Sequence, residues 1–338
     1  MKREAYFDNA KLLLIFLVVF GHMIQPFTDG SRPIYTLYTW IYTFHMPAFI
    51  FLSGFFAKGS GHKDYILKLA RKLILPYLIF QSVYTGYFFL MGDEDWLNGP
   101  FLPHWSLWFL FSLFCWHILL YWFKKLPPVM GILISVEIGL IIGYVSDVGQ
   151  LFSLSRTFVF FPFFLAGYWL TKEQVHKWRT TWVKEASLVV MAVIAAVIAI
   201  FPEFSSGWLL GSKSYEVLGT PELGGLFRLA VYILAGLMTI SILAWVPNKE
   251  FRLSHFGSRT LYVYLLHGFI IQFIRHEHLF KVDNILDLLG LAIMAATIVL
   301  ILSTNPIRTF TQPVIEGRTS QLQKWWARIT NKQSSIES

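Results

Sequence analysis

Ten apolar stretches, separated by short polar loops, set the strongest limit on what this chain can fold into. They span residues 10–26, 37–57, 73–91, 105–123, 128–146, 157–171, 185–201, 224–246, 259–274 and 285–304. About 20 apolar residues in a helix cross the hydrocarbon core of a bilayer, and tilt or mismatch accommodates longer and shorter stretches. The pattern therefore predicts an all-α integral membrane protein, a bundle of about ten transmembrane helices.

Composition excludes most other classes of protein. Hydrophobic residues make up 55% of the 338 residues and charged residues only 14%, whereas soluble domains carry about 25% charged residues. A soluble fold of this length cannot bury so much apolar surface in one core. The single cysteine, Cys115, excludes an intrachain disulfide framework and a multi-cysteine metal site. No HExxH, EF-hand or Gly-rich phosphate loop occurs, so we expect no bound metal.

The distribution of Lys and Arg predicts the orientation. With a cytoplasmic N-terminus, the cytoplasmic loops contain Lys58, Lys63, Lys68, Arg71, Lys72, Lys124, Lys125, Lys172, Lys177, Arg179, Lys184, Lys249, Arg252 and Arg259. The opposite loops hold only Arg32, Arg156, Lys213, Arg275 and Lys281. Cytoplasmic loops are normally enriched in basic residues, so both termini are expected in the cytoplasm. A membrane domain over residues 1–310 and a basic cytoplasmic tail over 311–338 follow. The scattered charge excludes nucleic-acid binding.

His22 is the first candidate for function, because ionisable residues inside spans are costly unless they face a cavity or a partner. At 100° per residue, His22 and Lys11 lie about 20° apart around one helix and about 16 Å apart along it. Asp8, Ile15 and Val18 belong to the same stripe. Neutral imidazole is an ordinary general base for taking a proton from a hydroxyl. The alternative is a structural histidine that bonds to a neighbouring helix.

His45 lies in the second span at a depth similar to that of His22. Two histidines at one level suggest a shared site, although interhelical hydrogen bonding explains one of them nearly as well. Pro47 follows closely and removes the partner of a carbonyl one turn back, near Thr43.

Further polar side chains inside the spans each have two interpretations. Glu137, in the fifth span, is a possible proton relay or a partner for a histidine. Arg228, in the eighth, either binds an anionic acceptor or extends toward the membrane surface. His267, in the ninth, is a candidate for substrate binding, and His117 is interpreted as structural.

A basic cluster, Lys68, Arg71 and Lys72, precedes the third span. Lys68 and Arg71 project from one helical face and can hold phosphates, Arg through its planar fork and Lys as a point charge. Ordinary cytoplasmic charge against anionic lipid is the favoured alternative.

Trp105, Ser106 and Trp108 open the fourth span at its outer boundary. Tryptophan is common at that depth as an interfacial anchor. Two indole rings and a hydroxyl beside a site also suit a sugar ring, so both interpretations remain.

Taken together, these motifs resemble the acyltransferase 3 family of membrane acyltransferases, most closely its bacterial branch of fucose acetylase-like and intercellular-adhesion polysaccharide enzymes. The resembling segments are Phe7-Asp8-Asn9-Ala10-Lys11, Phe20-Gly21-His22, Phe44-His45-Met46-Pro47, Phe51-Leu52-Ser53-Gly54-Phe55, Pro76-Tyr77, Trp105-Ser106-Leu107-Trp108-Phe109-Leu110 and Tyr264-Leu265-Leu266-His267. They cover most of the chain in the expected order.

The resemblance implies transfer of an acyl group, usually acetyl from cytoplasmic acetyl-CoA, to a hydroxyl of a carbohydrate outside the membrane. His22 matches the family's catalytic histidine. Lys11 stands where many members have arginine, and Lys68 with Arg71 matches a basic pair that is often two arginines. Both lysines keep the charge but lose bidentate geometry.

The resulting hypothesis places the CoA phosphates on the basic cluster and the thioester along the stripe from Lys11 to His22. His22 then deprotonates the acceptor, or forms an acyl-histidine. The main alternative is a proton-coupled transporter or flippase for a glycan or lipid-linked sugar, with Glu137 as the proton carrier. A structural protein of a polysaccharide export complex is the third.

Overall fold

The structure, a computed structural model, describes residues 4–58, 63–92, 97, 102–146 and 153–316, and every regular element in them is helical. The α-helices are α1 (Ala5–Ile24), α2 (Arg32–Tyr42), α3 (His45–Phe55), α4 (Lys63–Leu90), α5 (Trp108–Phe123), α6 (Pro128–Ile141), α7 (Leu154–Trp169), α8 (Lys172–Lys177), α9 (Thr181–Ile200), α10 (Gly207–Leu210), α11 (Gly224–Trp245), α12 (Thr260–His276), α13 (Ile285–Leu302) and α14 (Asn305–Ile315). Short 3₁₀ turns are η1 (Gln25–Phe27), η2 (Ile142–Tyr144) and η5 (Ser254–Arg259). The predicted all-α fold is confirmed.

Five helical segments are long and apolar enough to cross a membrane. They are Ala5–Phe27, Tyr65–Leu90, Thr181–Ile200, Gly224–Trp245 and Ile285–Leu302. Each of the ten predicted stretches overlaps at least one helix of the structure. The apolar helices identify a membrane protein, while a total of about ten spans and the orientation stay predictions.

The second predicted stretch, 37–57, is not one helix. α2 ends at Tyr42 and α3 begins at His45, because Phe44 between them leaves the helical conformation at φ −132° and ψ −26°. Pro47 lies in the first turn of α3, where its missing N–H costs no helical hydrogen bond. The break therefore precedes the proline and places His45 at the start of a helix.

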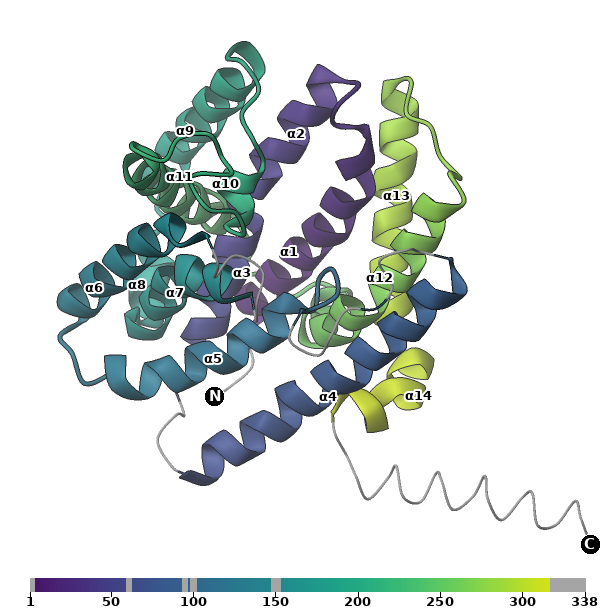
Figure 1. Cartoon of the computed structure of the whole chain (residues 1–338), viewed down its shortest axis with the longest axis horizontal. Helices are drawn as coiled ribbons and strands as arrows, with labels where there is room; N and C mark the ends of the chain where they lie inside the picture. The colour runs from purple at the N-terminus through teal and green to yellow at the C-terminus, as the bar shows by residue number, and fades with distance from the viewer. Residues whose placement is uncertain (1–3, 59–62, 93–96, 98–101, 147–152, 317–338) are drawn as a thin grey trace, which may run out of the picture.

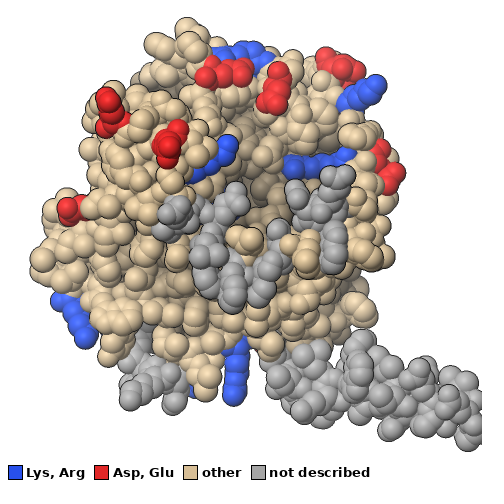
Figure 2. All heavy atoms as spheres, viewed as in Figure 1, with Lys and Arg blue, Asp and Glu red and all other residues tan. Residues whose placement is uncertain are grey.

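We call the end of the bundle where α1 begins the proximal end and the end where α1 finishes the distal end. In Figure 1, α4 begins and α14 lies toward the bottom of the view, with the N-terminus, whereas α9 ends at the top. An ion pair between Lys172 and Glu4 ties α8 to the start of α1 at the proximal end. In Figure 2, the lower half of the visible face shows basic but no acidic side chains among the described residues. The predicted orientation makes the proximal end cytoplasmic.

Two glycines bring the backbones of α3 and α7 into contact. A Cβ atom on Gly54 would overlap the carbonyl oxygen of Phe164, and one on Gly167 would overlap that of Phe51. Only residues without a side chain allow helices to approach so closely in a membrane bundle. This contact fixes the position of α7 beside the histidine-bearing helix α3.

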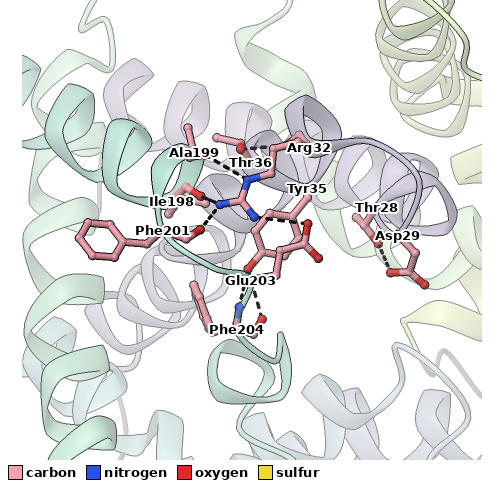
Figure 3. A network of polar contacts seen from close by, with 10 residues as sticks. All are labelled: Thr28, Asp29, Arg32, Tyr35, Thr36, Ile198, Ala199, Phe201, Glu203 and Phe204. Atoms are coloured by element: carbon pink, nitrogen blue, oxygen red, sulfur yellow. Dashed lines mark hydrogen bonds and ion pairs between the residues drawn. The ribbon is translucent and has the colours of Figure 1, made fainter.

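Arg32 joins the start of α2 to the end of α9 at the distal end (Figure 3). Its guanidinium donates to the carbonyl oxygens of Ala199 at 3.1 Å and Ile198 at 2.6 Å, and also to that of Phe201. Glu203 lies 3.4 Å away as its counter-ion. The last carbonyls of a helix lack partners within the helix, so a cation from another helix both satisfies and attracts them.

α14 continues the bundle beyond the predicted domain boundary at residue 310. Tyr262 of α12 donates a hydrogen bond of 2.5 Å to Glu316, immediately after α14. The predicted basic tail over 311–338 lies from residue 317 onward outside the described residues, and the proposed division stays a prediction.

Candidate active site

A cavity of about 130 Å³ opens among six α-helices, the turn η1 and the loop before α5 toward the distal end, and we call it the distal cavity. Its lining comprises His22, Gln25, Tyr42, His45, Met46, Trp105, Ser106, Trp108, Arg156, Phe160, Leu209 and Leu210. Imidazole, hydroxyl, indole and guanidinium groups thus meet in one small space. Among these lining residues there is no carboxylate. The cavity is suited to a polar ligand with hydroxyl or anionic groups.

His22, in the last turn of α1, is the centre of an aromatic group. Its ring centroid lies 4.5 Å from the ring of Trp105 and 5.7 Å from that of His267, which stacks on it. Trp105 and His267 also contact each other at 5.2 Å. Three elements far apart in the sequence, α1, α12 and the loop before α5, therefore fix the orientation of this imidazole.

Tyr42 forms the polar contact of the His22 ring, with its hydroxyl 3.3 Å from Nδ1. A Cβ on Gly21 would lie 3.0 Å from the Tyr42 ring, so the glycine lets the tyrosine approach α1. If Tyr42 accepts the Nδ1 hydrogen, the other nitrogen, Nε2, is left with its lone pair for a substrate proton. The hydrogen bond made by one ring nitrogen determines which nitrogen carries the proton, and so which one is free to react.

His45 and His267 each bond to a backbone carbonyl through Nδ1. The distances are 3.0 Å to Ile41 and 2.9 Å to Val263. A carbonyl oxygen only accepts, so Nδ1 carries the hydrogen in both rings and Nε2 of the neutral ring is an acceptor. Nε2 of His267 is buried without a partner among the described atoms. Both rings are held in a form that can take a proton.

Trp105 is held in an unusual backbone conformation, with φ at 42°. A non-glycine residue in the left-handed region costs of order 1 kcal/mol or more and persists only where its surroundings enforce it. Gly268, next to His267, makes room for the indole, since a Cβ there would lie 2.5 Å from a Trp105 ring atom. The left-handed backbone of Trp105 and the space at Gly268 together place the indole in contact with the imidazoles of His22 and His267.

Unpartnered polar atoms gather in and beside the distal cavity. Buried atoms that lack a hydrogen-bond partner within the described structure include Ser106 Oγ, Arg156 Nε, His267 Nε2 and Arg275 Nε. Arg156 stacks over the Trp108 ring at 5.0 Å. Buried polar groups are normally satisfied, so such a cluster indicates that a ligand or water completes it. The distal cavity is therefore prepared for a polar molecule.

A second cavity, of about 420 Å³, lies toward the proximal end, and we call it the proximal cavity. Lys11, Ser53, Tyr65, His117, Thr260 and Tyr264 supply its polar lining. Lys11 forms an ion pair of 3.0 Å with Asp8 and lies 5.2 Å from the Phe56 ring. The predicted stripe down α1 therefore has one end, Lys11, in the proximal cavity and the other, His22, in the distal cavity.

The two cavities approach each other along α3, α5 and α12. Met46 lines the distal cavity and Phe49, one turn later, lines the proximal cavity. On α5, Trp108 lines the distal cavity and the next residue, Phe109, lines the proximal cavity. Tyr264 lines the proximal cavity, and its hydroxyl donates 2.5 Å to the carbonyl oxygen of Ser106 in the wall of the distal cavity. These neighbouring side chains form a partition between the two spaces.

A family model for acyltransferase domains, acyltransferase 3, matches residues 4–304 of the chain. The chain belongs to the acyltransferase 3 family. Over 83 residues it is 34% identical to nodulation protein NolL of Mesorhizobium japonicum, an alignment that covers 22% of this chain and 22% of that protein. No solved structure matches. The resemblance read from the motifs is thereby confirmed, and the cavities belong to a member of this family.

The basic cluster lies on α4 at the proximal end. Lys68, Arg71 and Lys72 are exposed. They fall between Tyr65 and Leu73, which both line the proximal cavity. The three cations are thus placed along the helix that borders this cavity. Their assignment to CoA phosphates stays a prediction.

Two of the residues predicted to act in the site lie elsewhere. Arg228 is buried in α11, donates 2.5 Å to the carbonyl oxygen of Trp208 and stacks over its ring, outside the distal cavity. Glu137 is exposed on α6 rather than directed into either cavity. His117 lines the proximal cavity and contacts the Tyr65 hydroxyl at 3.1 Å. Among the described residues no group of three His, Cys, Asp or Glu is placed to hold a metal ion.

Three residues of the site escaped the sequence analysis. Arg156 and Arg275 were assigned to loops, because the apolar stretches 157–171 and 259–274 each stop one residue short of them. The structure places both inside helices, α7 and α12, beside His22. Tyr42 gave no signal as one tyrosine among many apolar residues. A search for charges that directly flank apolar stretches would have found the two arginines.

Proposed function

We propose that this acyltransferase moves an acyl group, acetyl being expected, from an acyl-CoA at the proximal end to a carbohydrate hydroxyl in the distal cavity. His22 is the general base. The observation that carries the proposal is the pair of neighbouring cavities on either side of this partition. Lys11 and the basic cluster border one of them, and His22 lines the other. Two substrates from opposite sides of a membrane can meet at such a partition.

The donor is a nucleotide thioester with several phosphates and a long, flexible arm. The exposed cations Lys68, Arg71 and Lys72 suit the phosphates, since Lys and Arg are the usual phosphate ligands. The proximal cavity is mostly apolar, and Phe109 and Tyr264 belong to its wall. It supports an arm that carries the thioester to the level of Met46 and Trp108.

In the proposed reaction, Nε2 of His22 takes the proton of the acceptor hydroxyl while the hydroxyl oxygen attacks the thioester carbonyl. The carbon–sulfur bond breaks as the new ester bond forms, and the CoA thiolate takes the proton from the imidazolium. Tyr42 stabilises the required tautomer through Nδ1. His45, also in the cavity wall, supports the proton transfer or binds the acceptor.

The tetrahedral intermediate requires a donor for its oxyanion. Arg156 is the best candidate, because it lines the distal cavity and its buried Nε has no partner among the described atoms. A preorganised cation in a low-dielectric site is usually the largest single contribution to such a reaction. Trp105 and Trp108 supply flat apolar faces of the kind that stack on sugar rings.

The transporter alternative has less support. It requires an intramembrane carboxylate that faces a central cavity, and the candidate Glu137 is exposed on α6. The lining of the distal cavity contains no carboxylate that could carry protons instead. An enzyme that uses imidazoles is favoured by the same lining.

The test uses purified full-length protein in liposomes with radiolabelled acetyl-CoA and an extract of bacterial surface glycans. We expect CoA release and transfer of label to carbohydrate by the wild type, and a loss of about 10²–10⁴-fold in His22→Ala, the range for a general base. His276→Ala is the matched control, because this exposed histidine at the end of α12 pairs with Glu277 and lines neither the distal nor the proximal cavity. It should keep full activity.

Thermal stability and gel-filtration profiles of each variant show whether the fold is retained. Transfer by His22→Ala at the rate of the wild type would refute the assigned base. An absence of CoA turnover by folded wild type, across a broad set of acyl donors and acceptors, would favour the transporter instead.

A further inference from the structure

A third cavity, of about 290 Å³, lies at the distal end beside the site, and we call it the lateral cavity. It is lined by Met23, Pro26, Phe27, Ile271, Ile274, Arg275, His278, Phe280 and Leu291. All but two of these side chains are apolar. The lateral cavity is bordered by η1, the end of α12 and the start of α13.

Arg275 forms the boundary between the lateral and the distal cavity. It lines the lateral cavity, and its guanidinium donates to the backbone carbonyl of His22 and, at 2.9 Å, to the side chain of Gln25. It also lies 5.8 Å from the Trp105 ring. Gln25 and Trp105 both line the distal cavity. One cation therefore touches a polar space on one side and an apolar space on the other.

The hydrogen-bonding capacity of Arg275 is not used up by these contacts. A guanidinium has five N–H donors, and the two bonds to His22 and Gln25 both come from one terminal nitrogen. Nε is buried without a partner, and no described carboxylate pairs with this arginine. Arg275 is partly buried, and a cation withdrawn from water without a counter-ion is costly, so the binding of an anion there is favoured.

We propose that the acceptor is a lipid-linked sugar in which a phosphate joins the sugar to a hydrocarbon chain. The sugar occupies the distal cavity beside His22, the phosphate binds Arg275, and the first part of the chain fills the lateral cavity. The order of environments, polar, cationic and then apolar, follows the order of the three parts of such a molecule. A free polymer has no hydrocarbon to place in the lateral cavity.

Access from the bilayer supports this assignment. α13, which contributes Leu291 to the lateral cavity, presents exposed apolar side chains such as Leu286, Leu289 and Ile293 on its outer face. In a membrane this face contacts lipid. Phe280, in the cavity wall, is 39% exposed. A hydrocarbon chain can therefore pass from the lipid into the lateral cavity without crossing a polar surface.

The sugar end of this assignment rests on the proposed acyl transfer, but the lipid phosphate end does not. It is tested by equilibrium binding of radiolabelled farnesyl phosphate to full-length protein in nanodiscs of phosphatidylcholine, without acyl-CoA. We expect the wild type to bind farnesyl phosphate at least tenfold more tightly than farnesol. Inorganic phosphate should compete at least 100-fold less well, since it lacks the chain.

Variants assign the two halves of the ligand to their sites. Arg275→Gln should weaken the binding of farnesyl phosphate about tenfold or more and leave farnesol unchanged. Ile274→Trp, which fills the lateral cavity, should weaken both. Lys281→Gln removes an exposed distal cation outside the cavity lining and should change neither. Comparison of farnesyl phosphate with farnesol on the wild type keeps the test valid even if a variant fails to fold.

Three outcomes would overturn the proposal: equal affinity for farnesyl phosphate and farnesol, unchanged affinity in Arg275→Gln, or displacement by phosphatidylglycerol as effective as by farnesyl phosphate. The last would mean a general site for anionic membrane lipid. His22→Ala should bind farnesyl phosphate like the wild type. Loss of transfer with binding retained in that variant separates the catalytic role of His22 from the lipid site.

Discussion

Arginines at the distal end of the bundle have two contrasting environments. Arg32 donates to three carbonyls at the end of α9 and pairs with Glu203 (Figure 3). Arg156 and Arg275 lie beside His22, and the buried Nε of each has no partner among the described atoms. The residue type and the level in the bundle are the same, yet only one of these cations is satisfied by the protein itself.

The difference separates a structural cation from one that awaits a ligand. A helix end offers several carbonyls with no partner of their own, so Arg32 removes a deficit on both sides. Arg156 and Arg275 instead leave N–H groups directed at cavities, where the unbound protein bears the cost of the missing bonds. Substitution of Arg156 or Arg275 should therefore reduce function, whereas substitution of Arg32 should reduce stability.

The largest effect on activity, after that of His22, is expected for Arg156→Gln. Removal of one preorganised donor to an oxyanion costs about 10²–10³-fold in kcat. We expect a loss of about 100-fold in kcat with little change in the KM for acyl-CoA, measured by CoA release in liposomes. Arg156→Lys keeps the charge and should recover part of the rate.

Loss of acyl-CoA affinity at an unchanged kcat would instead place Arg156 on the donor. A drop in thermal stability as large as that of an Arg32 variant would remove the contrast between the two environments. The kinetic constants and the thermal stabilities are both measured on the same set of purified proteins.

A smaller effect is expected for Tyr42→Phe. The variant keeps the ring that packs on Gly21 but removes the hydroxyl 3.3 Å from Nδ1 of His22. The imidazole then loses the partner that selects its tautomer, and a single such bond corresponds to about tenfold in rate. We expect kcat to fall about tenfold and to remain well above that of His22→Ala. Tyr35→Phe is the control, because the Tyr35 hydroxyl on the same helix bonds to the backbone of Phe204 and not to His22, and its kcat should equal that of the wild type.

The axis of the candidate site could be proposed from the sequence, because helix geometry is regular. The 11-residue spacing placed Lys11 and His22 on one stripe, and the structure puts them in the two cavities. His45 and His267 were found for another reason: a histidine inside an apolar stretch is conspicuous. The helical fold and the approximate bounds of the helices also follow directly from the apolar stretches.

The missing part of the site depends on contacts between distant segments. Arg156 and Arg275 flank apolar stretches, and a criterion based on hydropathy ends a span just where a charge begins. The interruption between α2 and α3 and the strained backbone of Trp105 leave no clear mark in the sequence. Glu137 was conspicuous for its charge, but the face it occupies on α6 is set by the packing of neighbouring helices.

The exposed Arg71 provides a third environment with a weaker expected effect. Solvent screens an exposed cation, so each contact with a phosphate contributes modestly. We expect the double variant Lys68→Gln and Arg71→Gln to raise the KM for acyl-CoA about three- to tenfold at low salt, with kcat unchanged. The difference from the wild type should shrink as salt concentration rises. A KM that does not change at any salt concentration would exclude the basic cluster from donor binding.

The smallest effect on activity is expected for Arg32→Gln, although it removes the most contacts. The variant loses the bonds to Ala199, Ile198 and Phe201, and we expect about 1–2 kcal/mol less stability because the side chain is partly solvated. A lower midpoint of thermal unfolding in detergent should accompany an unchanged kcat of the folded fraction. Glu203→Gln should lower the midpoint less, since the carbonyl bonds remain. Arg32 begins α2 and Tyr42 ends it. A large loss of kcat in Arg32→Gln without loss of stability would therefore mean that the contact between α2 and α9 controls the position of Tyr42 in the distal cavity.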